Sequence, residues 1–322
     1  MISFNTNSAA LGALDILRST DSQRNNSLSR MQSGYRVATA SDDAAYWSIA
    51  TTMRSDNQTL AAVEDALGMA SAVVDTAYNG FESATDLMAA FKQRLVLARE
   101  PGVDRDKINE ELTVYKQELQ TIAHASSFSG ENWMWRTSTV DDRDRSLVGS
   151  FHRETSGEIK VTDVNYEIAG TAGTTDVNFL VDDLSGDSGI LTGSGFAAAL
   201  GTSRTWVMFN GENGPTYDEM TIGENTTDAE IEEMISVVDA MAERVTDVSS
   251  SVGALSRRVE LQTSFVKDLQ DSLTYGVGRM VDADLNEEAT RFKALETQRK
   301  LGMESLSMIN TTYIDFFELM SA

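Results

Sequence analysis

A run of apolar residues spaced alternately three and four positions apart constrains this chain more than any other feature. The run extends without interruption from residue 60 to residue 98. Such spacing places the apolar side chains on one narrow stripe of an α-helix, the stripe that coiled-coil helices bury against each other. The members are Leu60, Val63, Leu67, Ala70, Val74, Ala77, Phe81, Ala84, Met88, Phe91, Leu95 and Ala98. The sequence therefore predicts a long helix that needs a partner.

Two further segments carry the same spacing and can supply that partner. Pro101 and Gly102 interrupt the first helix, and the spacing resumes over residues 108–122, which predicts an αα-hairpin. A third stripe covers residues 231–273. Because so narrow a stripe does not stabilise an isolated helix, the segments must pack together. We expect a mainly α fold in which long antiparallel coiled-coil helices from both chain ends pack together.

The segment between these flanks has a different composition. It contains 13 of the 22 glycines, from Gly130 to Gly223, and residues 137–228 carry 5 basic against 16 acidic side chains. Short alternating apolar runs, such as the one from Val177 to Val181, are typical of strands. We therefore expect a small, solvent-facing, β-rich surface domain inserted in the middle of the chain, with a hairpin near residues 146–168.

The totals exclude several classes of function. The net charge of −24 argues against nucleic acid as a partner, since phosphate binding needs a basic face. The chain has no cysteine, which excludes disulfides and thiolate metal sites. No run approaches the ~18 to 20 apolar residues of a membrane-spanning helix, so no membrane insertion is expected. The beginning of the sequence also lacks the pattern of a secretory signal peptide, which favours retention in the cytoplasm or export without a cleaved signal.

Acidic pairs near predicted helix starts resemble caps more than catalytic groups. Ser41 or Asp42 precedes a helical run from residue 44, where a short acceptor satisfies free N–H groups. Asp284 is a predicted N-cap with Glu287 three residues later. Neither site includes a histidine or lysine that would complete acid–base chemistry.

The sequence also argues against a metal site and against an enzyme. Asp182, Asp183 and Asp187 lie among glycines, but they lack the twelve-residue ligand order of a calcium loop, so an acidic turn is the favoured interpretation. The two histidines, His124 and His152, belong to no zinc motif. We expect no cofactor, no metal and no enzymatic activity.

Five short runs at the two ends of the chain identify a family. Residues 33–37 (SGYRV) and 41–50 (SDDAAYWSIA) resemble the N-terminal signature of bacterial flagellins. Residues 5–11 (NTNSAAL) are similar to the opening of the family, and residues 128–133 (FSGENW) to the point where its second helix ends. Residues 281–291 (VDADLNEEATR) resemble its C-terminal signature. The runs are similar to those of flagellins from soil α-proteobacteria.

The resemblance implies a structural subunit of the bacterial flagellar filament. Such a subunit is exported unfolded through a type III apparatus and assembles outside the cell into a helical, tubular propeller for motility. Its implied partners are other copies of itself, together with a filament cap, hook–filament junction proteins and an export chaperone.

The resemblance also implies a division into domains. Residues 1–40 and 280–322 would form an inner channel-lining helical domain. Residues 41–169 and 229–279 would form a rod domain of long helices with a β-hairpin. Residues 170–228 would form a variable surface domain.

Pattern and resemblance together name candidate residues. We expect assembly contacts at Leu11, Leu14, Leu17, Leu28, Met31, Leu301, Leu306, Phe316 and Phe317. We expect the rod seam to include Leu67, Val74, Phe81, Phe91, Val252, Leu255 and Val259. Gly34 is the expected turn between inner and rod domains, because a positive φ is accessible to glycine without strain.

Two alternatives share part of this evidence. A hook–filament junction protein has similar coiled-coil ends but lacks the dense signatures at residues 41–45 and 286–291. A secreted acidic adhesin or enzyme would need converging polar groups in residues 170–228, where the sequence offers none. Residues 314–322 (IDFFELMSA) depart from the usual ending of these flagellins, which points to a specialised subunit.

Overall fold

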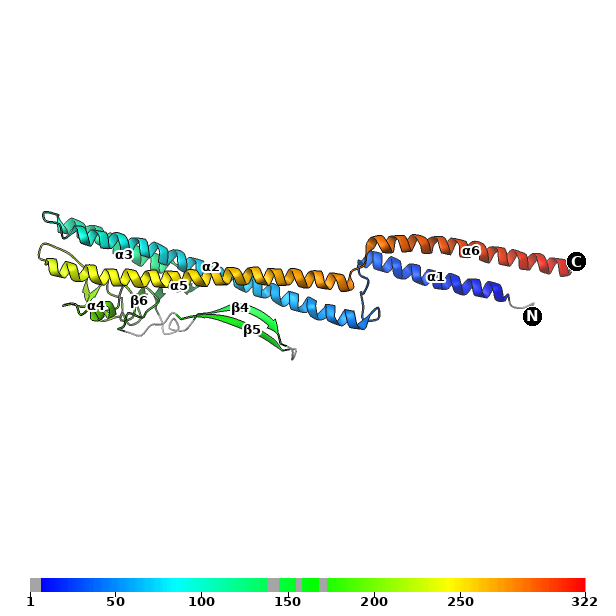
Figure 1. Ribbon diagram of the computed structural model, residues 1–322, viewed down its shortest axis with the longest axis horizontal. Helices are drawn as coiled ribbons and strands as arrows, with labels where there is room; N and C mark the ends of the chain where they lie inside the picture. Colours follow the sequence, from blue (N-terminus) through cyan, green and yellow to red (C-terminus); the bar gives the residue numbers. More distant parts are fainter. Residues whose placement is uncertain (1–6, 138–144, 155–157, 168–172, 322) are drawn as a thin grey trace. The chain divides into compact units, whose positions relative to one another are not determined.

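The computed structural model describes residues 7–137, 145–154, 158–167 and 173–321, and the side chains of residues 151, 152, 159 and 313–321 are not described. The chain divides into two compact units: unit 1 is Met1–Gln58 with Leu269–Ala322, and unit 2 is Thr59–Asp268. The longest helices are α2 (Ala44–Leu97) and α5 (Asp228–Val281) (Figure 1). The mainly α fold predicted from the spacing is confirmed.

Unit 1 contains a pair of helices, α1 (Ser8–Ser33) and α6 (Leu285–Ser321), which lie side by side in opposite directions (Figure 1). The Asn7 side chain caps α1 by accepting a hydrogen bond from the N–H of Ala10 at 3.0 Å. The Asp284 carboxylate caps α6 by accepting from the N–H groups of residues 286 and 287, at 2.8 and 3.2 Å. The N-cap predicted at Asp284 is therefore confirmed.

The start of α2 corrects one sequence prediction. The Asp43 carboxylate accepts hydrogen bonds from the N–H groups two and three positions ahead, both at 3.1 Å, so it caps the helix instead of Ser41 or Asp42. Asp42 accepts from the N–H of Thr39 at 2.9 Å and closes the preceding turn. The prediction was wrong because three adjacent acceptors are equivalent in sequence, and only the backbone path selects among them.

Unit 2 is built on α2, α5 and α3 (Arg105–Ala125). All twelve members of the stripe from residue 60 to residue 98 are buried. From Val74 onward the stripe shares one apolar cluster with buried residues of α3 and α5, such as Leu112 and Val245. An ion pair of 2.9 Å joins Arg94 of α2 to Glu111 of α3, and one of 2.7 Å joins Arg99, just after α2, to Glu232 of α5. The predicted αα-hairpin of α2 and α3 is confirmed.

The strands of unit 2 are short apart from one hairpin. β4 (Arg145–Arg153) pairs antiparallel with β5 (Ile159–Tyr166), with a bulge between Val148 and Ser150, so the predicted hairpin is confirmed. The remaining elements are β1 (Ser127–Phe128) with β2 (Glu131–Asn132), β3 (Trp135–Arg136) parallel to β6 (Val181–Asp182), β7 (Trp206–Val207) parallel to β8 (Asp218–Glu219), and helix α4 (Gly195–Leu200).

The expectation that the middle segment faces solvent is wrong for much of residues 177–222. The following residues are buried in the same cluster as the helices: Val177, Phe179, Leu180, Val181, Ile190, Leu191, Phe196, Trp206, Met208, Phe209, Met220 and Ile222. Arg244 of α5 donates to the Val177 carbonyl at 2.9 Å and forms an ion pair with Asp176 at 2.7 Å. The prediction was wrong because the net charge of this segment reflects only the side chains on its outer face. The apolar residues spaced along it form an inner face.

Candidate assembly surfaces

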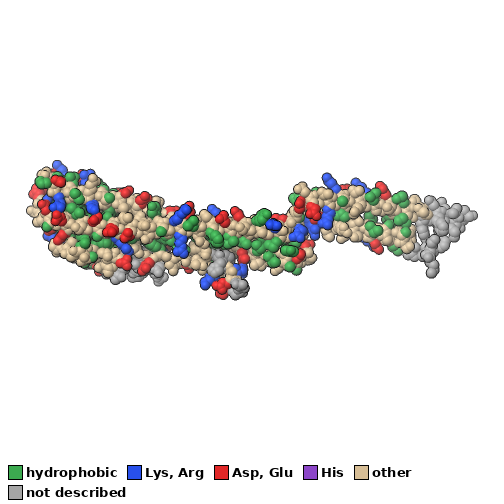
Figure 2. Space-filling model, viewed as in Figure 1, with side chains coloured by type: hydrophobic (Ala, Val, Ile, Leu, Met, Phe, Trp, Pro, Cys, Tyr) green, Lys and Arg blue, Asp and Glu red, His purple; other side chains and the backbone are tan. Residues whose placement is uncertain are grey.

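The α1–α6 pair exposes many of the apolar side chains predicted to make assembly contacts. Leu11 is 52% exposed and Leu301 is 58% exposed. The others with described side chains are half-buried: Leu14, Leu17, Leu28, Met31 and Leu306. Phe316 and Phe317 lie on α6, but their side chains are outside the described ones. Two helices alone cannot cover both of their apolar faces, and Figure 2 shows apolar side chains on the visible face of this pair.

Sequence reasoning missed other exposed members of the same surface. Ile16 on α1 and Met303 and Met308 on α6 are all exposed. Each lies outside the short apolar patterns considered above, although Met308, seven residues after Leu301, continues the spacing of three and four. Together with the preceding residues they form what we call the inner-pair surface.

A buried carboxylate lies between the two helices. Glu288 of α6 accepts a hydrogen bond from the Ser27 hydroxyl at 2.6 Å, and the Arg30 guanidinium lies 3.3 Å away. The Arg291 guanidinium is at 3.6 Å from the same carboxylate. Burial raises the pKa of Glu288, but the Ser27 hydroxyl and the Arg30 guanidinium outweigh that effect and hold the pKa below its ordinary value. The carboxylate is therefore ionised at neutral pH.

Gly34 lies at the turn that follows α1. Its φ of 74° is left-handed, and its N–H donates to the Arg30 carbonyl at 2.8 Å, as expected of a helix C-cap. The Gly34 carbonyl accepts from the N–H of Ala283 at 2.9 Å, and the next residue forms a β-bridge with Asp282. The turn thus ties the end of α1 to the segment just before α6.

A second group of exposed side chains lies in the residues that follow this turn in unit 1, and we call it the patch around Gly34. It consists of Tyr35, Tyr46, Trp47 and Ile49, all of them exposed. The guanidinium of Arg54 lies 5.0 Å from the Tyr35 ring centroid, within cation–π range. The sequence analysis used these aromatic residues only for resemblance and did not predict their exposure. Aromatic residues are enriched in protein–protein contact surfaces.

The candidate rod-seam residues occupy the interior of unit 2. Leu67, Val74, Phe81 and Phe91 are buried on α2, and Val252, Leu255 and Val259 are buried on α5. Polar contacts also join these two helices; for example, the Ser256 hydroxyl donates to the Asp75 carboxylate at 2.7 Å. These side chains are covered within the chain itself.

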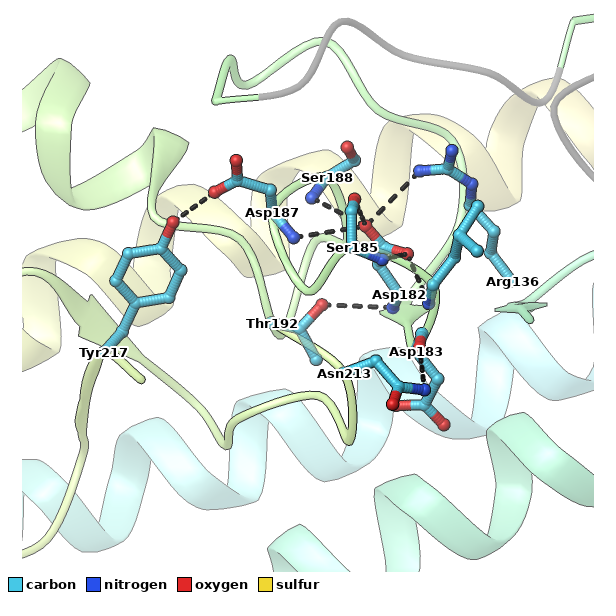
Figure 3. A network of polar contacts seen from close by, with 10 residues as sticks. Arg136, Asp182, Asp183, Ser185, Asp187, Ser188, Thr192, Asn213 and Tyr217 are labelled. Atoms are coloured by element: carbon cyan, nitrogen blue, oxygen red, sulfur yellow. Dashed lines mark hydrogen bonds and ion pairs between the residues drawn. The ribbon is translucent and has the colours of Figure 1, made fainter. Parts of the chain in front are cut away.

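The three acidic residues near the middle form a closed network (Figure 3). The buried Asp182 carboxylate accepts from four N–H groups, of residues 184, 185, 187 and 188, at 3.0 to 3.1 Å. It also accepts from the Ser185 hydroxyl at 2.6 Å and from Arg136 at 3.3 Å. Burial raises the pKa of Asp182, but these donors outweigh it and lower the pKa. Asp183 and Asp187 accept from residues 212 and 217.

This network is an acidic turn and supplies no open ligand site, because the Asp182 oxygens already face donors of the chain itself. Within the described residues, no group of three acidic or histidine side chains is arranged to hold a metal ion. His124 instead packs edge-on against the Trp135 ring, with centroids 5.3 Å apart. No described helix has the length and hydrophobicity needed to cross a bilayer. Among the described residues, the candidate assembly surfaces are the inner-pair surface and the patch around Gly34.

In comparisons with known proteins, both ends of the chain match regions of one protein family. Residues 4–139 match the family model of the bacterial flagellin N-terminal helical region, and residues 235–317 match that of the C-terminal helical region. The chain is similar to flagellin C of Rhizobium meliloti (strain 1021), with 44% identity over 318 residues that cover 97% of each protein. It is 38% identical to a flagellin A of Rhizobium meliloti, covering 97% of this chain and 98% of the relative. It is 32% identical to a flagellin of Brucella melitensis biotype 1, covering 97% and 96%.

Proposed function

The chain belongs to the bacterial flagellin family and is a structural subunit of a flagellar filament, and we propose that its inner-pair surface and the patch around Gly34 are the surfaces through which copies of it assemble. Self-assembly follows from family membership. The assignment of particular residues to subunit contacts is the part that we propose.

One observation supports the proposal above the rest. On the α1–α6 pair, Leu11, Ile16, Leu301 and Met308 are each more than half exposed to water. Apolar area left in water costs about 25 cal/mol per Å², so covering it with a neighbouring subunit is favourable. In a helical lattice every subunit offers the same surface to its neighbours, so the gain repeats with each added copy.

We propose the domain division that the resemblance implies. Residues 1–40 and 280–322 would form the inner domain, and residues 41–169 and 229–279 the rod domain. Residues 170–228 would form a surface domain whose inner face, including Phe179 and Trp206, belongs to the rod core. The buried inner face limits how freely this segment can be replaced.

The further partners and the location are also proposals. A filament cap, hook–filament junction proteins and an export chaperone would bind the chain before or during assembly, and the assembled filament would be extracellular. The purpose of the molecule is structural, and it needs no cofactor.

Electron microscopy of the purified full-length chain, mixed with short filament seeds, tests the proposal. We expect wild-type protein to extend the seeds into tubular helical filaments. Replacing Leu301 and Met308 by serine removes apolar area from the inner-pair surface, so the double variant should extend seeds at least tenfold more slowly. A matched control replaces exposed Val114 of α3, which lies outside both surfaces, by serine and should grow normally.

The outcomes distinguish the assignment of particular contact residues from the filament function itself. Normal growth of the Leu301 and Met308 double variant would exclude these residues as assembly contacts while leaving the filament function intact. Failure of the wild-type chain to extend intact seeds would instead favour a junction or other specialised role.

A further inference from the structure

Among the side chains that the structure describes, the α1–α6 pair has little apolar packing that could fix its register. Ala10 and Leu295 are buried apolar residues of the pair, while the longer apolar side chains remain half-exposed or exposed. Loosely packed apolar stripes tolerate sliding of one helix along the other, because each position finds a similar neighbour. Something other than apolar packing must therefore favour one register.

We propose that two polar ties between α1 and α6 fix the register of this pair: Glu288 with Ser27 and Arg30, and Arg299 with Asp21. The Glu288 side chain is only 7% exposed. The Arg299 guanidinium lies 2.9 Å from the Asp21 carboxylate. The two ties point in opposite directions, since the acidic residue is on α6 in one and on α1 in the other.

The first tie opposes sliding through the buried charge. A shift of one helical turn moves α6 by roughly 5.4 Å along α1. The hydrogen bond between Ser27 and Glu288, 2.6 Å long, cannot survive that displacement. A buried carboxylate that loses its donors is strongly destabilising, so shifted registers are disfavoured.

The second tie opposes sliding through like charges. Along α1, arginines lie three residues before and three residues after Asp21, at Arg18 and Arg24. A shift of about one turn in either direction therefore carries Arg299 from a carboxylate to a guanidinium. Like charges brought together raise the free energy of the shifted state, a common way to specify one pairing over its alternatives.

The register decides which side chains face outward together. Leu17 of α1 lies beside Gly302 of α6, with its Cδ1 atom 3.3 Å from the position of a Cβ atom added at Gly302. A one-turn shift would place Leu17 beside Leu306 and would rearrange the inner-pair surface. The effect on filament growth rests on the function proposed above, whereas the register itself does not.

Disulfide trapping in the full-length chain tests the register directly, because the natural sequence has no cysteine. Leu17→Cys with Gly302→Cys reports the native register, and Leu17→Cys with Leu306→Cys reports the shifted one. Both pairs are oxidised in the free chain and during seeded growth, and the ratio of native to shifted disulfide is measured. The ratio is compared between the wild-type background, Glu288→Leu and the matched control Glu287→Leu, which alters the exposed neighbour.

We expect Glu288→Leu to lower this ratio about tenfold, equivalent to about 1.4 kcal/mol, and Glu287→Leu to leave it unchanged. If Glu288→Leu loses its helical circular dichroism, the double variant Asp21→Arg with Arg299→Asp decides. That variant keeps an ion pair in the native register but also offers arginine partners one turn away on both sides, so its ratio should fall as well.

An unchanged ratio in every folded variant would overturn the proposal. Wild-type seed extension, measured in the same samples, reports separately on the filament function. If the wild type extends seeds but the disulfide ratio is the same in every variant, the polar ties are refuted and the filament function stands.

Discussion

Replacing Phe179 by alanine tests whether the middle segment is part of the rod core. Phe179 is 2% exposed and lies in one cluster with residues of α2 and α5. Removing a buried phenylalanine costs about 3–5 kcal/mol, and the Arg136 guanidinium, 5.8 Å from the ring centroid, adds up to ~1 kcal/mol. At about 2–4 °C per kcal/mol for a domain of this size, the melting temperature of unit 2 should fall by roughly 10 °C.

The assay is urea unfolding followed by two probes, far-ultraviolet circular dichroism for the helices and fluorescence of tryptophans such as buried Trp206 for the middle segment. We expect both midpoints to fall together in Phe179→Ala, because helices and middle segment share one core. Val161→Ala, at a position 48% exposed on β5, should change the unfolding free energy by less than about 0.5 kcal/mol. A fluorescence midpoint that falls while the helical midpoint stays fixed would refute the shared core.

Three further tests use denaturant unfolding. Gly80→Ala should lower the unfolding free energy by about 1–3 kcal/mol, because the added Cβ would lie 2.4 Å from two side chains. Its control, Gly68→Ala in open space on the same helix, should raise the unfolding free energy by roughly 0.5–1 kcal/mol. Equal effects would contradict the packing at residue 80. Burial lowers the pKa of Lys116 from 10.5 to about 8, so the unfolded chain binds more protons between these values and stability should rise by roughly 3 kcal/mol from pH 8 to 10.5. Lys116→Met should abolish that rise, and a persisting rise would exclude this lysine as its source. Asp182→Ala should lower the unfolding free energy by at least about 3 kcal/mol at pH 7, because it leaves several buried donors unsatisfied. Since the pKa of Asp182 is lowered in the folded state, its carboxylate stabilises the fold above pH 3.8, and this stabilisation is lost as the pH falls through the folded pKa. A variant as stable as wild type at pH 7 would contradict the network.

Periodicity predicted the long helices because burial of a narrow stripe leaves a repeated mark in the sequence. The stripe from residue 60 to residue 98 is buried throughout, and the helix break at Pro101 lies where the sequence indicates. The periodic pattern of apolar residues is weaker in the middle segment. Its strands β6, β7 and β8 have two residues each, too few for an alternating pattern to show which face packs inward.

The polar contacts of the candidate surfaces could not be predicted for a different reason. Ser27 and Glu288 are 261 positions apart, and neither residue carries a local signal of the other. In the sequence, Glu288 is one of the acidic residues in the first turn of α6, so nothing local distinguishes it from Glu287. The exposure of Tyr46 and Trp47 also depends on which neighbours the fold brings to them. Contacts across long separations come from the fold and not from the local sequence.

The seam between α2 and α5 has a consequence for the order in which structure forms. The contact between Asp75 and Ser256 spans 181 positions, so the apolar stripe of α2 has no α5 to cover it until most of the chain is available. Cores made of distant pairings form slowly, because a long loop must close before any contact rewards it. An N-terminal fragment that ends before α5 should therefore keep part of the α2 stripe exposed to water and to other binders. The seam between the two long helices can therefore close only once the second of them is present.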